Sequence, residues 1–317
     1  METNNSMPEI SIIVPLYNEQ DNINPLYALI CEVMDNAGIS FELIFVDDGS
    51  TDNSPSIIKG LSKKDSRIRF ASFSRNFGHE AASSCGFRMV AGKTAVLIDA
   101  DMQDPPSLIP EMYKKWKEGY EVVYAKRLSR QGETFLKKFT SHLFYKIMNR
   151  FSKIKIPIDV GDFRLVDRTV IDAFNRLTER NRFVRGLFTW VGYKQTAIAY
   201  NRLPRSKGKT KYNWVRLLLL SMDAFFSFSL VPLRLCIIFG IGTIIFSFMT
   251  VGSIVIQRLF LGLEIPGYAL LTAGMFLLGG IQLTFLGIIG EYIGKIYTEV
   301  QNRPLYIIKE SSELNKN

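Results

Sequence analysis

The sequence predicts an α/β domain with a mostly parallel sheet, followed by two C-terminal transmembrane helices. In the first 125 residues, short β-rich apolar runs alternate with helical patterns, which is typical of a sheet covered on both faces. From Leu217 to Gly290, charged residues nearly vanish and Leu, Ile, Phe and Gly dominate. The remaining polar part of this 317-residue chain is long enough to bury its own core.

Four apolar runs are the predicted buried strands, and two of the segments between them have helical patterns. The strands are Ile10–Val14, Leu43–Val46, Ala95–Ile98 and Val122–Tyr124, and the helices are Pro25–Ala37 and Ser54–Lys63. Polar clusters follow three of these strands: Asn18-Glu19, Asp47-Asp48 and Asp99 with Asp101. Because α/β sheets bind ligands beyond the carboxyl ends of their parallel strands, we expect the functional site there.

Two apolar stretches, residues 233–256 and 267–290, are long enough to cross a membrane. As helices, each would rise about 36 Å, against a hydrocarbon core of about 30 Å. Neither has a polar face, which disfavours a pair of buried core helices. Lys and Arg crowd before the first stretch and recur after the second, whereas the connector holds only Arg258. We therefore expect both termini in the cytoplasm and the connector outside.

These features divide the chain into consecutive segments. Residues 1–212 are expected to form a cytoplasmic domain, 213–232 a juxtamembrane helix, 233–256 and 267–290 the two spans, 257–266 an external loop, and 291–317 a cytoplasmic tail that is frayed from Ser311. The first residues lack the pattern of a signal peptide. Residues 134–150 form a basic amphipathic helix with two open interpretations, since it lies either on the membrane surface or against the core.

The formal net charge of +9 predicts an anionic partner. Basic residues between Arg202 and Arg216 lie just before the apolar stretches, so we expect a membrane surface, and no nucleic-acid-binding motif appears. The three cysteines have neither disulfide nor zinc spacing. A phosphate-binding glycine loop of the P-loop or dinucleotide type is also absent, which argues against kinases and dehydrogenases.

The segment from Asp99 to Gln103 offers oxygen ligands at a predicted strand end. If the alternation of the strand continues, Asp99 and Asp101 point the same way. Two carboxylates and an amide oxygen suit Mg²⁺ or Mn²⁺, which would offset charge on a departing diphosphate. The Asp47-Asp48 cluster has a second interpretation, as a plain turn or a helix N-cap. The two histidines, His79 and His142, form neither a zinc pattern nor a triad, and we interpret them as structural or surface residues.

Six sequence blocks carry a family resemblance. They are SIIVPLYNE (11–19), ELIFVDDGSTD (42–52), SRNFG (74–78), LIDADMQDPP (97–106), EVVYAKR (121–127) and GDFRLVDR (161–168). The chain resembles glycosyltransferase family 2, whose catalytic domains have the GT-A fold. Within that family it is similar to the polyprenyl-phosphate glycosyltransferases, such as dolichyl-phosphate mannose synthase and bactoprenol glucosyltransferase. The two C-terminal spans fit the bactoprenol branch.

The resemblance implies roles for the residues that would bind the nucleotide-sugar donor. Pro15, Tyr17 and Glu19 would line the nucleobase and ribose pocket, and Asp48 would hydrogen-bond the base. Asp99 would face the ribose or the donor sugar.

The resemblance also implies roles at the metal, the phosphates and the acceptor. Asp101, with help from Gln103, would hold the metal, and Asp162 is either a catalytic base or a carboxylate that positions the acceptor. Four basic residues are candidates for the phosphates of donor or acceptor: Lys126, Arg127, Arg205 and Lys211. For the last two, attraction to lipid headgroups is equally open. Arg164 has a rival structural interpretation, as a partner of Asp162 or Asp167. Residues 183–193 form either a loop over the site or a packed helix.

The implied reaction is inverting transfer of a hexose, with glucose from UDP-glucose favoured, to undecaprenyl phosphate on the cytoplasmic membrane face. A phosphate monoester has its second pKa near 6, so the lipid phosphate is mostly a dianion at neutral pH, and we expect Asp162 to orient it rather than deprotonate it. A homo-oligomer, such as a tetramer, is expected from small-residue faces on the spans. One alternative is a processive polysaccharide synthase, whose Gln-x-x-Arg-Trp block is absent. Another is an inactive membrane scaffold, which the retained acidic residues disfavour.

Overall fold

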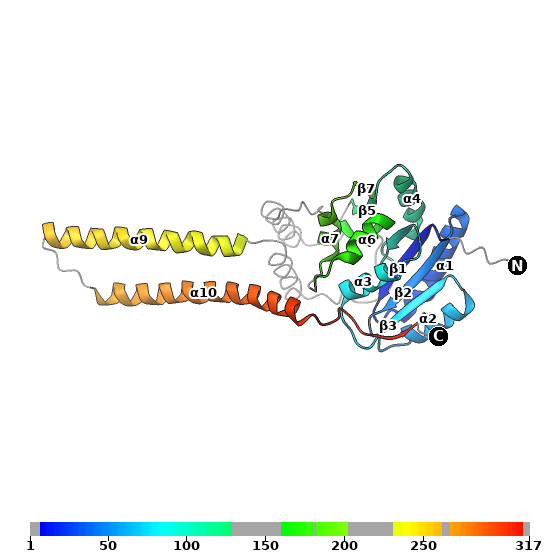
Figure 1. Cartoon of the computed structure of the whole chain (residues 1–317), viewed down its shortest axis with the longest axis horizontal. Coiled ribbons are helices and arrows are strands. Elements are labelled where there is room, and N and C mark those ends of the chain that lie inside the picture. The colour runs from blue at the N-terminus through cyan, green and yellow to red at the C-terminus, as the bar shows by residue number, and fades with distance from the viewer. Residues whose placement is uncertain (1–6, 129–159, 181, 202–230, 262–266, 313–317) are drawn as a thin grey trace. The chain divides into compact units, whose positions relative to one another are not determined.

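The computed structural model of the chain describes residues 7–128, 160–180, 182–201, 231–261 and 267–312 (Figure 1). The chain divides into two compact units. The first contains the sheet and the helices around it, and it includes the C-terminal residues 303–317. The second contains the two long helices near the C-terminus. The predicted helix at 134–150, as well as Arg205 and Lys211, lies outside the described residues.

The described strands form one sheet in the order β7-β5-β6-β4-β1-β2-β3-β8. Their bounds are β1 Ile10–Leu16, β2 Phe41–Asp47, β3 Ile68–Phe73, β4 Thr94–Leu97, β5 Val122–Arg127, β6 Val160–Asp167, β7 Gln195–Tyr200 and β8 Ile308–Ser311. Strand β1 is parallel to β2 and β4, and β2 is parallel to β3. Strand β6 is antiparallel to both β4 and β5. The predicted α/β fold with a mostly parallel sheet is therefore confirmed.

Helices cover both faces of this sheet. The described helices of the first unit are α1 Gln20–Ala37, α2 Ser54–Lys64, α3 His79–Met89, the 3-10 turn η1 Pro106–Leu108, α4 Ile109–Lys117, α6 Arg168–Arg176 and α7 Val184–Val191. Every residue of β1 and β2 is buried, as predicted for strands covered on both sides. Residues 183–193 contain α7, which agrees with the packed-helix interpretation.

Helix α3 packs unusually close to the sheet, and this contact positions the site. A Cβ added at Gly86 would lie 2.2 Å from Cγ2 of Ile13 in β1, so only glycine allows this approach. Phe87, in the same helix, packs against Phe188 of α7 and Phe174 of α6 with ring centroids 5.0 and 5.3 Å apart. The first residue of α3, His79, is thereby held at the end of the sheet where polar residues gather.

The C-terminal tail differs from its prediction. Residues 291–301 continue a helix, and Ser311 belongs to β8, which pairs antiparallel with β3, rather than to a frayed end. The Tyr306 ring stacks on Phe73, with centroids 4.8 Å apart and 7° between the ring planes. The backbone N–H of Ser74 donates to the carbonyl of Ile307 at 3.0 Å. The physical reason is that the edge of β3 would otherwise expose unpaired backbone groups.

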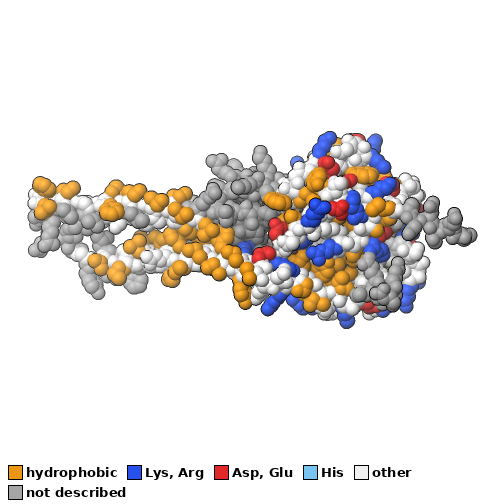
Figure 2. Space-filling model, viewed as in Figure 1, with side chains coloured by type: hydrophobic (Ala, Val, Ile, Leu, Met, Phe, Trp, Pro, Cys, Tyr) orange, Lys and Arg blue, Asp and Glu red, His pale blue; other side chains and the backbone are white. Residues whose placement is uncertain are grey.

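The second unit contains helices α9 (Val231–Leu261) and α10 (Tyr268–Gln301), which contact each other. Helix α9 runs past residue 256 into the predicted external loop, and α10 runs past residue 290 into the predicted tail. Many of their described apolar side chains are exposed (Figure 2). By length and composition, one described helical segment could cross a membrane, Leu277–Gln301, and a shorter apolar segment is Cys236–Thr250. The two predicted spans therefore remain a prediction.

The pairing of β8 leads to a stability prediction. A chain that ends at Leu305 would lose Tyr306 and β8, and we expect its unfolding free energy to fall by about 2–3 kcal/mol. The reason is that ladder hydrogen bonds and the ring stacked on Phe73 are lost together. The control ends at Ser312 and lacks only residues 313–317. Thermal unfolding in detergent, followed by circular dichroism, measures the difference, and equal melting temperatures would contradict the role of β8.

Candidate functional site

Hydrogen bonds join the loops that follow β1 and β2. The backbone N–H of Asn18 donates to Oγ of Ser50 at 2.8 Å, and the N–H of Thr51 donates to Oδ1 of Asn18 at 2.8 Å. Asn18 adopts a left-handed conformation with φ of 55°, which asparagine tolerates better than most residues. These contacts form one connected wall at the carboxyl ends of the two strands.

Three of the predicted nucleotide-binding residues lie in β1 or just after it. Pro15 is in β1, Tyr17 follows the strand, and Glu19 precedes α1. The Glu19 carboxylate accepts a hydrogen bond from Nδ2 of Asn22 at 2.7 Å, which gives it a structural contact inside the loop. The structure thus brings these three predicted residues to one edge of the sheet.

Asp48 and Gly49 tie a third loop to the same edge. The buried Asp48 carboxylate accepts hydrogen bonds from the backbone N–H groups of Phe77, at 2.7 Å, and Gly78, at 2.9 Å. Burial raises the pKa of Asp48, and these two donors oppose that shift. Gly49 has φ of +70°, and a Cβ there would lie 2.3 Å from the carbonyl carbon of Arg75. Asp48 therefore holds the loop that leads into α3, and its predicted bond to a nucleobase stays a prediction.

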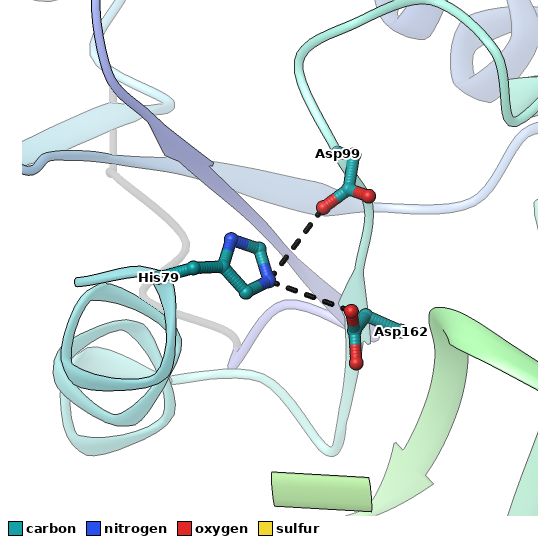
Figure 3. A group of neighbouring side chains, drawn as sticks. All are labelled: His79, Asp99 and Asp162. Atoms are coloured by element: carbon teal, nitrogen blue, oxygen red, sulfur yellow. Dashed lines mark ion pairs between the residues drawn. The ribbon is translucent and has the colours of Figure 1, made fainter. Parts of the chain in front are cut away.

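His79, Asp99 and Asp162 form the centre of the site (Figure 3). His79 is the first residue of α3, Asp99 follows β4, and Asp162 is in β6. Nε2 of His79 lies 3.7 Å from Oδ1 of Asp99 and 3.6 Å from Oδ2 of Asp162. The side chains of His79 and Asp99 are 37% and 25% exposed, whereas that of Asp162 is 8% exposed. The cluster is accessible from the His79 and Asp99 side.

Arg185, in the first turn of α7, is the cationic partner of the Asp162 side chain. Its Nε donates to Oδ1 at 2.7 Å and its Nη2 to Oδ2 at 2.6 Å, in the two-pronged geometry that makes such pairs strong. Arg164 instead donates to the backbone carbonyls of Gly161, at 3.0 Å, and Asp162, at 3.2 Å. It also lies over the Phe188 ring, 5.2 Å from its centroid. Arg164 thus makes a structural contact with Asp162, as its rival interpretation expected, but through the backbone of Asp162 rather than its carboxylate.

The pKa values of Asp162, Asp99 and His79 are shifted to different degrees and in different directions. Burial opposes ionisation of Asp162, but the charge and hydrogen bonds of Arg185, helped by His79, hold the pKa of Asp162 well below its usual range. Burial raises the pKa of Asp99 to about 6. Burial alone would lower the pKa of His79, but its interactions with Asp162 and Asp99 raise it to about 10. These contacts favour an ionised Asp162 and a protonated His79.

The segment after Asp99 is a turn rather than a continued strand. Strand β4 ends at Leu97, and Met102 has a left-handed φ of 60°. The Asp101 carboxylate accepts a hydrogen bond from the backbone N–H of Gln103 at 3.2 Å. The alternation argument for Asp99 and Asp101 therefore fails, because the extended backbone on which it depends is absent here.

The donor set nevertheless fits a divalent cation. Asp99, Asp101 and Gln103 supply the oxygen ligands that Mg²⁺ and Mn²⁺ prefer, and the carboxylates of Asp101, Asp104 and Asp162 add negative charge near Asp99. Ligand atoms of His79, Asp99 and Asp162 also lie within 4.8 Å of one another. However, Arg185 already engages both oxygens of Asp162. We therefore keep Asp101 and Gln103 as the predicted metal ligands.

The described phosphate-binding candidates, Lys126 and Arg127, lie at the end of β5. Nη2 of Arg127 lies 2.8 Å from where a Cβ of Gly161 would be, so its guanidinium contacts the residue that precedes Asp162. Its Nε donates to the hydroxyl of Tyr200 at 3.4 Å. Arg127 is therefore beside the site, as a phosphate ligand would need to be.

Sequence reasoning missed His79 and the pairing of Arg185. His79 was interpreted as structural or surface, but it lies between two of the predicted site carboxylates. The available signal was position, since His79 follows the SRNFG block directly and Gly78, with φ of 102°, precedes the helix. Arg185 had no comparable signal, because its link to Asp162 arises only when α7 packs on β6.

The comparisons with known proteins identify the family of this chain. Residues 11–174 match the model of glycosyl transferase family 2, and the chain belongs to this family. It is 45% identical to an uncharacterized glycosyltransferase of Synechocystis sp., over 95% of both chains. It is 48% identical to the uncharacterized glycosyltransferase YkcC of Bacillus subtilis, over 96% of this chain and 94% of that one. The predicted family resemblance is confirmed.

A further relative bears a more specific name. The chain is 39% identical to the bactoprenol glucosyl transferase of Shigella phage SfII, over 97% of this chain and 99% of that one. Among solved structures, glucosyl-3-phosphoglycerate synthase from Mycobacterium tuberculosis has a TM-score of 0.46 at 19% identity, over 68% of this chain and 76% of that one. That structural likeness is too remote to bear on the reaction.

Gly49 provides a direct test of the close packing between the two loops beside the site. Gly49→Ala combines left-handed strain with a collision against the Arg75 backbone, so we expect the unfolding free energy to fall by about 2–5 kcal/mol. Gly38→Ala is the matched control, because Gly38 has φ of +64° but nothing within 4 Å of an added Cβ. Strain alone there costs about 1–2 kcal/mol. Chemical denaturation compares the two variants, and equal losses would show that the predicted collision does not occur.

Proposed function

We propose that this protein transfers a hexose, with glucose from UDP-glucose as the best candidate, to undecaprenyl phosphate on the cytoplasmic face of a membrane. The observation that carries this proposal is the extent of similarity to a bactoprenol glucosyl transferase, which covers 97% of this chain. That similarity extends beyond residues 11–174, which the family model matches, and includes the region of α9 and α10. A polyprenyl phosphate acceptor accounts for a glycosyltransferase domain joined to apolar helices.

The membrane arrangement is part of the same proposal. The apolar segment Leu277–Gln301 supports anchoring by α10. We propose that α9 also spans, with 1–212 and 291–317 in the cytoplasm, as the distribution of Lys and Arg indicates. Homo-oligomer formation stays a prediction from the small residues of these helices.

The proposed reaction is a single in-line displacement. An oxygen of the lipid phosphate attacks the anomeric carbon, the new carbon–oxygen bond forms, and the bond from that carbon to the nucleoside diphosphate breaks. The diphosphate leaves with the bonding electrons, so an α-linked donor gives a β-linked product. Because the lipid phosphate is mostly a dianion at neutral pH, no proton has to be removed from it.

Asp162 is poorly suited to act as a base and well suited to hold a cation. Its pKa lies well below the usual range, so it has little tendency to take a proton at neutral pH. A carboxylate directly against a phosphate dianion would also repel it. We infer that Asp162 acts through Arg185, whose side chain is 33% exposed and whose charge suits the acceptor phosphate. Asp162 is then a positioning residue for Arg185.

A second group of residues would bind the nucleotide-sugar donor and the metal ion. Pro15, Tyr17 and Glu19 would hold the nucleoside at the edge of β1, and Asp99 would face the ribose or the donor sugar. When bound to Asp101 and Gln103, Mg²⁺ or Mn²⁺ would offset the negative charge of the diphosphate. Catalysis then consists mainly of positioning and of charge stabilisation.

A transfer assay in detergent tests the proposed function. Purified protein with Mg²⁺ or Mn²⁺ and undecaprenyl phosphate is offered radiolabelled UDP- and GDP-sugars in parallel. We expect label from one UDP-hexose to enter the organic phase, and Asp101→Ala to reduce the rate by about a hundredfold or more because a predicted metal ligand is lost. If no donor yields lipid-linked label, the proposal is wrong.

A further inference from the structure

The start of α7 takes its hydrogen-bond acceptor from another helix. The first N–H groups of a helix have no partner inside it, and a Ser, Thr, Asp or Asn side chain just before the helix usually accepts one of them. The residue before α7 is Phe183, whose side chain contains no oxygen or nitrogen atom. The backbone N–H of Val184, the first residue of α7, instead donates to Oε2 of Glu80 at 2.9 Å. A side chain of α3 therefore caps α7.

Glu80 belongs to a helix that is held firmly against the sheet. It is the second residue of α3, and the Asp48 carboxylate holds the backbone N–H of Gly78 just before that helix. Farther along α3, Gly86 lies so close to Ile13 of β1 that no other residue fits there. Glu80 therefore offers its oxygen from a fixed position.

A second contact joins α3 to the chain that leads into α7. Ser84 follows Glu80 by four residues, so the two side chains share one face of α3. The Ser84 hydroxyl accepts a hydrogen bond from Nη1 of the buried Arg182 at 3.4 Å and donates to the carbonyl of Glu80 at 2.7 Å. Nε of Arg182 also donates to the carbonyl of Glu179 at 3.2 Å. Helix α3 thus holds both the first residue of α7 and the segment before it.

The residue that follows Val184 is Arg185, the cationic partner of Asp162. Its guanidinium donates to both carboxylate oxygens of Asp162, at 2.7 and 2.6 Å. The Arg185 side chain begins one residue after the backbone group that Glu80 holds. A shift of the start of α7 would therefore move this guanidinium relative to β6, which contains Asp162.

We propose that Glu80 is a positioning residue, which fixes the start of α7 through the Val184 N–H and thereby places the Arg185 guanidinium for the acceptor phosphate. This inference rests on the proposed function, in which Arg185 meets that phosphate. Displacement of a binding group by about 1 Å can lower a rate by about a hundredfold. The oxygen of a carboxylate, a carboxylic acid or an amide can accept the hydrogen bond, so the role requires an oxygen atom rather than a charge.

The rival interpretation is that Glu80 acts through its negative charge, since Arg185 lies within electrostatic reach of it. Two substitutions separate the interpretations. Glu80→Gln keeps an oxygen acceptor and loses the charge, whereas Glu80→Ala loses both. The matched control is Glu111→Ala, because Glu111 is an exposed acid in the first turn of another helix, α4.

Hydrogen exchange in the full-length protein tests the cap without any measurement of transfer. We expect Glu80→Ala to raise the exchange rate of the first amides of α7 by about tenfold, because the Val184 N–H loses its acceptor. Glu80→Gln and Glu111→Ala should leave that rate within about threefold of the wild-type rate. Unchanged exchange in Glu80→Ala, or equal increases in the Ala and Gln variants, would overturn the proposal.

Kinetics test whether the cap acts through Arg185. We expect Glu80→Ala to lower kcat by about tenfold to a hundredfold and to raise KM for the lipid phosphate, with KM for the donor within about threefold. Glu80→Gln should restore most of the rate. When Arg185→Ala is already present, Glu80→Ala should cost less than about twofold.

The same loss of rate with and without Arg185 would overturn the positioning role, because a general structural defect acts in both backgrounds. If the wild-type protein itself transfers no sugar to lipid phosphate, the proposed function fails. Hydrogen exchange would then still decide whether Glu80 holds the start of α7.

Discussion

The site depends on compensation of buried negative charge at one end of the sheet. Asp162 lies in β6 and Asp99 follows the neighbouring strand β4, and both side chains lie where water screens them weakly. Neither strand carries the cation that pairs with their carboxylates. The positive charges come from His79 at the start of α3 and Arg185 at the start of α7. The two helices must therefore pack correctly before the acids can both remain charged.

The hydrophobic core provides this packing. Phe87 of α3, Phe174 of α6 and Phe188 of α7 form one aromatic group, in which the last two rings stack with centroids 4.6 Å apart. Mutual contact of these rings links the helices that present His79 and Arg185. In addition, Asp48 holds the loop that leads into α3. Fold stability and site geometry therefore depend on the same contacts.

The sequence predicted the elements that are local in the chain. The strands with continuous apolar runs were predicted, and so were the polar residues at their carboxyl ends. Both features can be recognised from a few consecutive residues. The strands β3, β6, β7 and β8 were not predicted. Strand β8 in particular forms because the edge of β3 needs a partner, which no local pattern shows. The position of His79 beside Asp99 and Asp162 and the pair of Arg185 with Asp162 likewise arise from tertiary packing.

One measurement addresses the central claim, that Asp162 positions Arg185 and takes no proton. It is the dependence of kcat on pH for the wild-type protein and for Asp162→Asn. Since the pKa of Asp162 is depressed, it is ionised throughout the neutral range. Both rates should rise with the second ionisation of the lipid phosphate, near pH 6, and then level off, with the variant about a hundredfold lower throughout. A variant rate that keeps climbing with hydroxide until it meets the wild-type rate would contradict the account.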